Sequence, residues 1–169
     1  MQAKTNKRRQ HIRYICQSGI IAALYTALTC LSGAFGLASG PIQLRISEAL
    51  CVLPVFTPAA IPGLTVGCLL SNILNSCIWQ DVLFGTLATL LGALGAYLLR
   101  RLPYLSPLPT VLSNTLIVPF VLAFAYHAEE GIPYLMLTVG AGEILSAYVL
   151  GVLLYLALKR YKNRFWESI

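Results

Sequence analysis

Charged residues are scarce in this sequence. They make up only 11% of its 169 residues, and six of them are acidic, whereas about a quarter of the residues in soluble domains are charged. A membrane span needs roughly 20 predominantly apolar residues. The composition therefore predicts an integral membrane protein with several spans, and it leaves little chain for a soluble domain. Four long stretches contain no Asp, Glu, Lys or Arg: 14–44, 49–80, 82–99 and 102–128.

Motifs of enzyme active sites and of metal centres are also absent. The chain has no GxxxxGK[ST] phosphate loop, no HExxH and no GxSxG, so it does not hydrolyse ATP through a phosphate loop. Its five cysteines lie in or beside apolar stretches and form no CxxC pair. This is typical of small packing residues rather than of disulfides or metal ligands. We therefore expect no catalytic residues, no metal site and no cofactor bound by this chain.

The sequence does contain a series of apolar segments separated by turn residues. The region 46–75 is interpreted as two helices, because Pro54, Pro58 and Pro62 each remove a backbone donor and disfavour helix at the preceding residue. The first of these, about 46–56, would be only ~16 Å long, too short for a hydrocarbon core of about 30 Å. Its ends must then be covered by protein or line a cavity. The other helices are expected at about 15–35, 79–99, 108–126 and 132–158.

The distribution of basic residues supports six helices. With six, eleven of the twelve Lys and Arg residues lie on the cytoplasmic side, as the positive-inside rule favours, and Arg45 is the exception. With five, seven of the twelve lie outside. We therefore expect a multi-pass protein of the cell membrane with both termini cytoplasmic: a basic segment at 1–14, a membrane domain at 15–161 and a tail at 162–169. The net charge of +6 then reflects topology, and we expect no nucleic-acid partner.

Small residues recur at helical spacing in three of the expected helices. Such rows let helices approach closely in lipid. All three can mediate packing within the bundle, and the row in the first helix can instead dock another membrane protein. The rows are Gly19, Ala23 and Ala27; Gly85, Ala88, Gly92 and Ala96; and Gly140, Ala147 and Gly151.

Polar and charged residues gather toward the outer ends of the expected helices, and an ionisable group inside a membrane is by default a functional hypothesis. Glu143 is expected near mid-depth on a face of small residues, and Asn114 in the inner half of its helix. Glu143 could instead make a structural hydrogen bond or salt bridge. Arg45 and Glu48 could form an i, i+3 ion pair, and Asp81 could be a helix-start acid. The outer group comprises Gln43, Arg45, Glu48, Asn72, Asn75, Gln80 and Asp81.

Several stretches together carry a family resemblance. They are LRISEALCVLPVFTPAAIPGLTVGCLLSNIL at 44–74, QDVLFGTLATLLGALGAYLLRR at 80–101, the AxxxA of Ala23 and Ala27, and the SN…P of the fifth helix. With six short helices and basic cytoplasmic ends, the chain resembles the QueT-type S components of energy-coupling factor (ECF) transporters over about 15–161.

The resemblance implies an all-α, six-helix S-component bundle whose short second helix lies within it. It also implies a membrane subunit that binds queuosine precursors, which are 7-deazaguanines, in a site open to the outside. In S components the AxxxA of the first helix contacts a transmembrane partner, and two ATPase subunits of the same complex use ATP.

The chemistry of such a ligand indicates roles for particular residues. A guanine-type edge presents two adjacent N–H donors beside a carbonyl; a carboxylate accepts both donors, and an amide can serve the carbonyl. Glu143 and Asn114 are the candidates for that edge, although the inner depth of Asn114 conflicts with an outward site. A cationic aminomethyl substituent would pair with Glu48 or Asp81. The predicted substrate-binding residues are Arg45, Glu48, Asn72, Asp81, Asn114 and Glu143.

Other functions remain open from the sequence alone. An S component for another vitamin-like solute would share the same architecture. A membrane scaffold without transport activity would use the same row of small residues in the first helix but would need no buried carboxylate. A membrane enzyme is disfavoured by the missing motifs.

Overall fold

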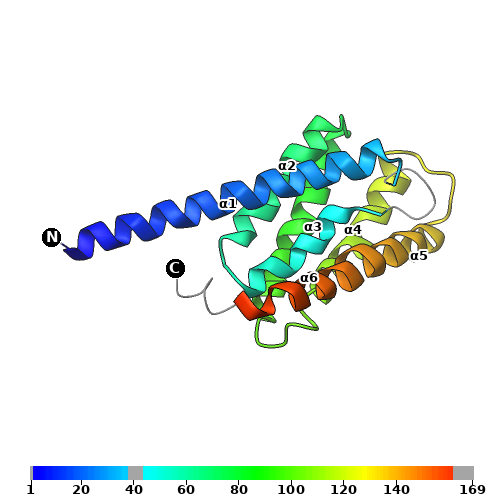
Figure 1. Cartoon of the computed structure of the whole chain (residues 1–169). Helices are drawn as coiled ribbons and strands as arrows, with labels where there is room; N and C mark the ends of the chain where they lie inside the picture. Colours follow the sequence, from blue (N-terminus) through cyan, green and yellow to red (C-terminus); the bar gives the residue numbers. More distant parts are fainter. Residues whose placement is uncertain (1, 38–43, 162–169) are drawn as a thin grey trace.

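The structure, a computed structural model, describes residues 2–37 and 44–161. Every regular element in these ranges is helical, as predicted, and the elements pack into one bundle (Figure 1). The last three membrane segments in sequence are α3, α4 and the continuous run α5–η2–α6, which has one π-helical turn at its centre. The bounds are α1 Gln2–Ala34, η1 Ile46–Val55, α2 Ala60–Leu74, α3 Trp79–Leu98, α4 Leu108–Phe124, α5 Ile132–Glu143, η2 Ile144–Val149, α6 Leu150–Leu158 and η3 Lys159–Tyr161.

The helices differ in whether they can cross a membrane alone. Three runs are long and apolar enough by length and composition: Lys7–Ala34, Trp79–Leu98 and Ile132–Leu158. The others, η1, α2 and α4, are shorter apolar helices. A bundle in which long helices shield short ones satisfies backbone groups that lipid cannot. All six expected helices are present, and the boundaries of the last three were predicted to within two residues.

The first helix begins earlier than the sequence analysis placed it. We expected a helix from about 15, but α1 runs without a break from Gln2. Residues 2–14 of the basic segment are therefore part of the same helix. At 1.5 Å per residue its 33 residues measure about 50 Å, more than a hydrocarbon core of about 30 Å. Figure 1 shows the N-terminal part of α1 extending past the bundle. The tail 162–169 lies outside the described residues.

The short second helix lies at the centre of the fold. It is confirmed in position, but η1 is a 3-10 helix with Pro54 inside it, so the α-helical rise that we assumed was too small. Its ten residues span about 20 Å at the 3-10 rise of 2.0 Å. That is still too short to cross a membrane alone. Elements α1, α2, α3, η2 and α6 all contact η1, which supplies the protein cover that a short buried helix requires.

Glycines allow the closest helix contacts. A Cβ placed on Gly63 of α2 would lie 2.9 Å from the Cβ of Ile21, and one on Gly67 would lie 2.8 Å from the Cβ of Tyr25. Distances this short exclude any larger residue at either position without a shift of α1. This close pair was not predicted, because its GxxxG motif stands among prolines and in a short helix.

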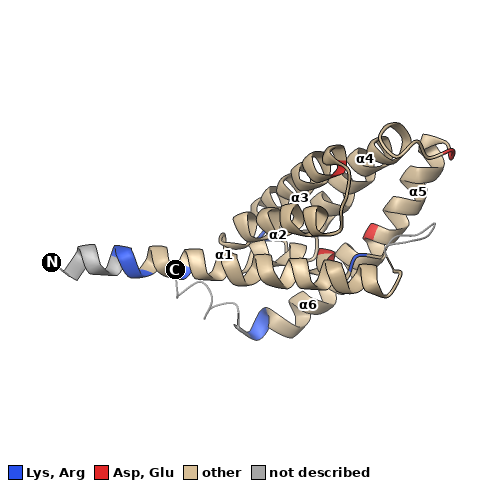
Figure 2. Ribbon diagram, turned by 90° about the horizontal axis from the view of Figure 1, so that it is seen from above, with Lys and Arg blue, Asp and Glu red and all other residues tan. Residues whose placement is uncertain are grey.

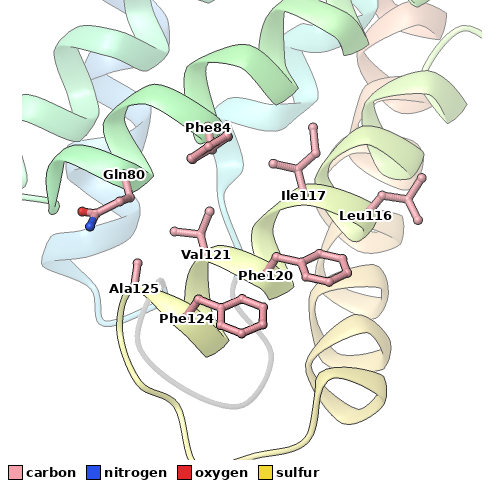
Figure 3. Close-up of a pocket in the computed structure, with 8 residues that line it drawn as sticks. All are labelled: Gln80, Phe84, Leu116, Ile117, Phe120, Val121, Phe124 and Ala125. Carbon is pink, nitrogen blue, oxygen red and sulfur yellow. The ribbon is translucent and has the colours of Figure 1, made fainter.

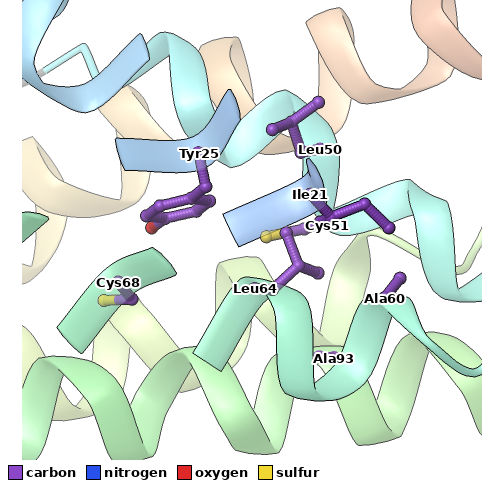
Figure 4. Close-up of a cluster of buried hydrophobic side chains, with 8 residues drawn as sticks. All are labelled: Ile21, Tyr25, Leu50, Cys51, Ala60, Leu64, Cys68 and Ala93. Carbon is purple, nitrogen blue, oxygen red and sulfur yellow. The ribbon is translucent and has the colours of Figure 1, made fainter. Parts of the chain in front are cut away.

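The three predicted rows of small residues face different ways. The rows in α3 and in α5–η2–α6 are buried within the bundle, which confirms the packing interpretation for both. The row in α1 is different, because Gly19, Ala23 and Ala27 are all exposed. The opposite face of α1, with Ile21 and Tyr25, enters the hydrophobic core (Figure 4). Packing within the bundle therefore does not explain the α1 row.

Basic residues mark one end of the bundle. Figure 2 shows them concentrated along the N-terminal part of α1 and beyond the end of α6. Arg100 and Arg101 directly follow α3 and lie at this same end of the bundle, as the order of six helices requires. The acidic Glu129 and Glu130 lie in the α4–α5 connection at the opposite end.

Candidate functional site

A wide cavity opens among the helix ends that lie away from the basic end. It has a volume of about 390 Å³, within the range of roughly 300–1,000 Å³ that is typical of ligand pockets. The end of α2 contributes Asn72, the first turn of α3 contributes Asp81, and Arg45 stands just before η1. We call this the wide cavity; its lining residues are Thr29, Gly33, Arg45, Asn72, Asn75, Cys77, Asp81, Val118, Leu122 and Tyr126.

A narrow cavity adjoins it, since Arg45 and Val118 line both. Its volume is about 20 Å³, little more than a single water needs. The narrow cavity is nevertheless rich in polar groups, and four helical segments converge on it. Its lining residues are Arg45, Glu48, Gly85, Thr89, Asn114, Val118, Val139 and Glu143.

The two cavities bring together all six predicted substrate-binding residues. Three of them, Arg45, Asn72 and Asp81, line the wide cavity. Glu48, Asn114 and Glu143 line the narrow one, together with Arg45. Arg45 stands just before η1, and the other five come from η1, α2, α3, α4 and α5, so the six are separated by up to about a hundred positions in sequence. The inner depth of Asn114 therefore does not separate it from the other predicted residues, because Asn114 lines the narrow cavity.

Glu143 is a buried carboxylate with spare hydrogen-bonding capacity. Its side chain is 7% exposed, and Oε2 has no hydrogen-bond partner among the described residues. The polar groups within electrostatic reach are Glu48, Asn114 and Arg45. Glu143 is also the last residue before the π-helical segment η2, and such turns occur often at functional sites. An isolated structural salt bridge does not describe this environment.

Glu48 is held from two sides. The hydroxyl of Tyr25 donates to its Oε1, and the thiol of Cys51 donates to its Oε2 at 3.1 Å. Two further hydrogen bonds join η1 to α1 nearby: Thr29 Oγ1 to Ser47 Oγ at 2.8 Å, and Ile46 N–H to Ser32 Oγ at 3.1 Å. Both oxygens of Glu48 are thus occupied by the protein, unlike those of Glu143.

Arg45 is the cation between the two cavities. Asp81 and Glu48 are the carboxylates within its electrostatic reach, yet in the described part of the chain neither forms a direct salt bridge with it. The contact that joins Arg45 to Glu48 is a backbone one, from Glu48 N–H to the Arg45 carbonyl at 3.0 Å. The proposed i, i+3 ion pair is therefore not formed, and Arg45 lines both cavities.

Asp81 closes one wall of the wide cavity. The Tyr126 hydroxyl, at the end of α4, donates to Asp81 Oδ2 at 3.1 Å. The Asn72 side-chain amide donates to the Asp81 carbonyl at 3.4 Å. Asp81 does lie in the first turn of α3, where a helix-start acid is favoured, but its side chain also lines the cavity.

Sequence reasoning missed several lining or supporting residues, among them Tyr25, Thr89 and Tyr126. Each is a common residue in a membrane helix or loop, and no spacing motif marks it. Tyr25 carried one usable signal, since it stands on the face of α1 opposite to the row of small residues. In residues 2–37 and 44–161 no group of His, Cys, Asp or Glu is placed to hold a metal ion.

Comparison with known proteins identifies the family of this chain. The model of a family described as QueT transporter matches residues 15–160. The protein named Queuosine precursor transporter QueT from Lactococcus lactis subsp. cremoris (strain MG1363) is 43% identical over 83 residues. That alignment covers 48% of each chain, so it spans about half the length of this relative. No solved structure matches the chain. Because the family model covers most of the sequence, this membrane protein belongs to the QueT transporter family.

Proposed function

We propose that this chain is the substrate-binding membrane subunit of an ECF-type importer and that it takes up queuosine precursors. The observation that carries the proposal is the pair of adjoining cavities with the partnerless Glu143 oxygen inside them. A buried acceptor without a donor costs free energy unless a ligand supplies one. The name of the Lactococcus lactis relative supplies the substrate class.

The base of the ligand is assigned to the narrow cavity. Glu143 would accept the two adjacent N–H donors of a guanine-type edge, and Asn114 would bond to its carbonyl or to a ring nitrogen. The present volume of about 20 Å³ is too small for any ring, so binding requires this cavity to widen. The wide cavity offers the entry route and continues past Arg45.

The substituent of the base is assigned to the wide cavity. Of the two carboxylates considered for a cationic aminomethyl group, Glu48 has both oxygens engaged by Tyr25 and Cys51. Asp81 accepts a hydrogen bond from Tyr126 on one oxygen only, and it lines the wide cavity, which has space for a substituent. We therefore assign the cation to Asp81 and give Glu48 the role of fixing η1 against α1.

The exposed row on α1 supports the proposal of a transmembrane partner. Ala23 and Ala27 face away from the bundle, which suits close approach by a helix of a transmembrane partner. Two ATPase subunits would complete the complex and hydrolyse ATP, with no cofactor bound by this chain. The basic end of the bundle is assigned to the cytoplasm, which puts both termini there and opens the wide cavity to the outside of the cell membrane.

A calorimetric titration of the purified chain tests the proposal. We expect saturable binding of 7-deazaguanines and no heat from adenine or uracil, because neither presents the guanine edge to Glu143. Tight binding of an unrelated vitamin alone would favour an S component for another solute. Failure to bind any small solute would favour a membrane scaffold.

Asp81→Asn provides a specific prediction. The variant should bind a 7-deazaguanine with a cationic aminomethyl group at least about tenfold more weakly, because a charged hydrogen bond contributes roughly 1.5–3 kcal/mol. Its affinity for a 7-deazaguanine with a neutral substituent should stay within about twofold. The measurement is a pair of titrations on the parent, Asp81→Asn and the exposed control Glu130→Gln. Equal losses for both ligands would remove Asp81 from substituent recognition.

A further inference from the structure

Tyr126 lines the wide cavity without a role in the proposed transport function. It lies just after the end of α4, and the cavity brings it together with Asn72 near the end of α2 and Asp81 in the first turn of α3. Tyr126 is 43% exposed, so packing in the core does not account for this side chain. Its position at the junction of three helix ends suits a role in the site itself.

The backbone next to the cavity adopts an unusual conformation at two places. Ser76 and His127 have φ values of 55° and 53°, in the left-handed region that side chains other than glycine rarely occupy. Ser76 directly precedes Cys77, and His127 directly follows Tyr126; both Cys77 and Tyr126 line the wide cavity. Strained backbone of this kind gathers at functional sites. The turn after α4 therefore holds Tyr126 in a specific place.

The hydroxyl of Tyr126 fixes one oxygen of Asp81. It donates a hydrogen bond to Asp81 Oδ2 at 3.1 Å, as a tyrosine that keeps its proton at neutral pH can do. The other oxygen, Oδ1, lies on the side of Gly85: a Cβ placed on Gly85 would be 3.4 Å from it. Gly85 lines the narrow cavity, to which the base of the ligand is assigned. Tyr126 thus holds Asp81 from one side and leaves Oδ1 toward the base.

Arg45 is the group that competes for Asp81. It lines both cavities and has Asp81 within electrostatic reach, yet the two form no direct salt bridge in the part of the chain that the structure describes. Arginine and a carboxylate readily form a bidentate pair, and an aspartate without a fixed donor would be free to turn toward the guanidinium. The hydrogen bond from Tyr126 opposes that rotation and keeps Asp81 available to a ligand.

We propose that Tyr126 is a positioning residue that sets the preference of the site for a cationic substituent, because its hydroxyl holds Asp81 with Oδ1 free for an ammonium group. The inference rests on the proposed recognition of 7-deazaguanines and adds a residue that determines which substituent is preferred. Tyr126 acts through Asp81. The hydroxyl is therefore the part of the side chain that matters for selectivity.

The variant Tyr126→Phe, which removes only the hydroxyl, tests this role. The parent and the variant are titrated by calorimetry with two 7-deazaguanines that share the guanine edge, one with an aminomethyl and one with a methyl substituent. The variant should bind the aminomethyl compound about threefold to tenfold more weakly, the effect of one hydrogen bond, and the methyl compound within about twofold of the parent. A tyrosine with a purely structural role would change both affinities alike.

A double variant tests whether Tyr126 acts through Asp81. In the Asp81→Asn background the hydroxyl no longer has a carboxylate to orient. Adding Tyr126→Phe should therefore weaken binding of the aminomethyl compound by less than about a further twofold, because two changes in one interaction are not additive. Losses that multiply would overturn the positioning role.

Phe124→Leu is the matched control, since it removes a neighbouring aromatic ring. Phe124 is 69% exposed, and Figure 3 shows it with Ala125 on a separate groove between α3 and α4 that shares no residue with either cavity. This variant should keep both affinities within about twofold of the parent.

The titrations separate failure of this inference from failure of the proposed function. If Tyr126→Phe keeps the affinity ratio of the parent, or binds the aminomethyl compound more tightly, the positioning role is wrong while the proposed function stands. A parent protein that binds neither compound would overturn both.

Discussion

Glu143→Gln is expected to bind 7-deazaguanines at least about tenfold more weakly, while the melting temperature of the ligand-free protein stays nearly unchanged. The amide keeps one acceptor but presents a donor to a ligand donor, so one charge-assisted hydrogen bond is lost, worth roughly 1.5–3 kcal/mol. The ligand-free protein loses little, because Glu143 Oε2 has no hydrogen-bond partner in the described structure. Calorimetric titration and a thermal melt in detergent measure the two quantities.

Glu48→Gln is the matched control, since it makes the same chemical change in the same cavity. Both Glu48 oxygens accept hydrogen bonds, from Tyr25 and Cys51. An amide cannot accept both, so this variant should lower the melting temperature of the ligand-free protein. If Glu143→Gln instead binds as tightly as the parent, recognition must rest on Arg45 and Asp81. A steep fall in its ligand-free melting temperature would make Glu143 a structural residue.

The double variant Ala23→Leu/Ala27→Leu should lower uptake in cells at least about tenfold, with substrate affinity retained. Small residues let two transmembrane backbones approach closely, and two leucines would hold them apart. The bundle itself should tolerate the change, because both alanines are exposed. Uptake of labelled precursor and co-purification of the transmembrane partner measure the loss.

Ala157→Leu gives the corresponding control, at an exposed alanine in α6, outside the α1 row. It should leave uptake and co-purification as in the parent. Normal uptake by the α1 double variant would exclude this face as the docking surface. Lost substrate binding by that variant would show that the leucines disturb the bundle rather than the docking.

The helices were predictable because a membrane imposes strong rules on sequence. Long uncharged stretches, three prolines and the distribution of basic residues were enough to locate six helices and to divide the region 46–75. The pitch of η1 was not predictable, since it depends on how the surrounding helices enclose Pro54 and its neighbours. The start of α1 was missed because polar residues 2–14 continue a helix without an apolar periodicity to mark it.

The position of six polar residues at the two cavities was predictable, but their individual environments were not. A polar residue in a membrane segment needs a reason, and that argument singled out six of the residues that line the two cavities. It could not show that Glu48 is bonded on both sides while Glu143 is not. That difference comes from Tyr25 and Cys51, whose hydrogen bonds depend on the packing of α1 against η1. It also could not show that Arg45 lies where the two cavities meet.

The central position of η1 has a consequence for how the protein is made. In membranes, helices that are stable as single spans form first and associate afterwards, and α1, α3 and α5–η2–α6 are long enough to do so. The ten residues of η1 are too short, and part of their cover comes from η2 and α6, which are synthesised last. Until then Glu143 is absent as well. The narrow cavity is therefore complete only once the final helix has entered the membrane, so a nascent chain released before that step is inserted but lacks the Glu143 wall of the candidate site.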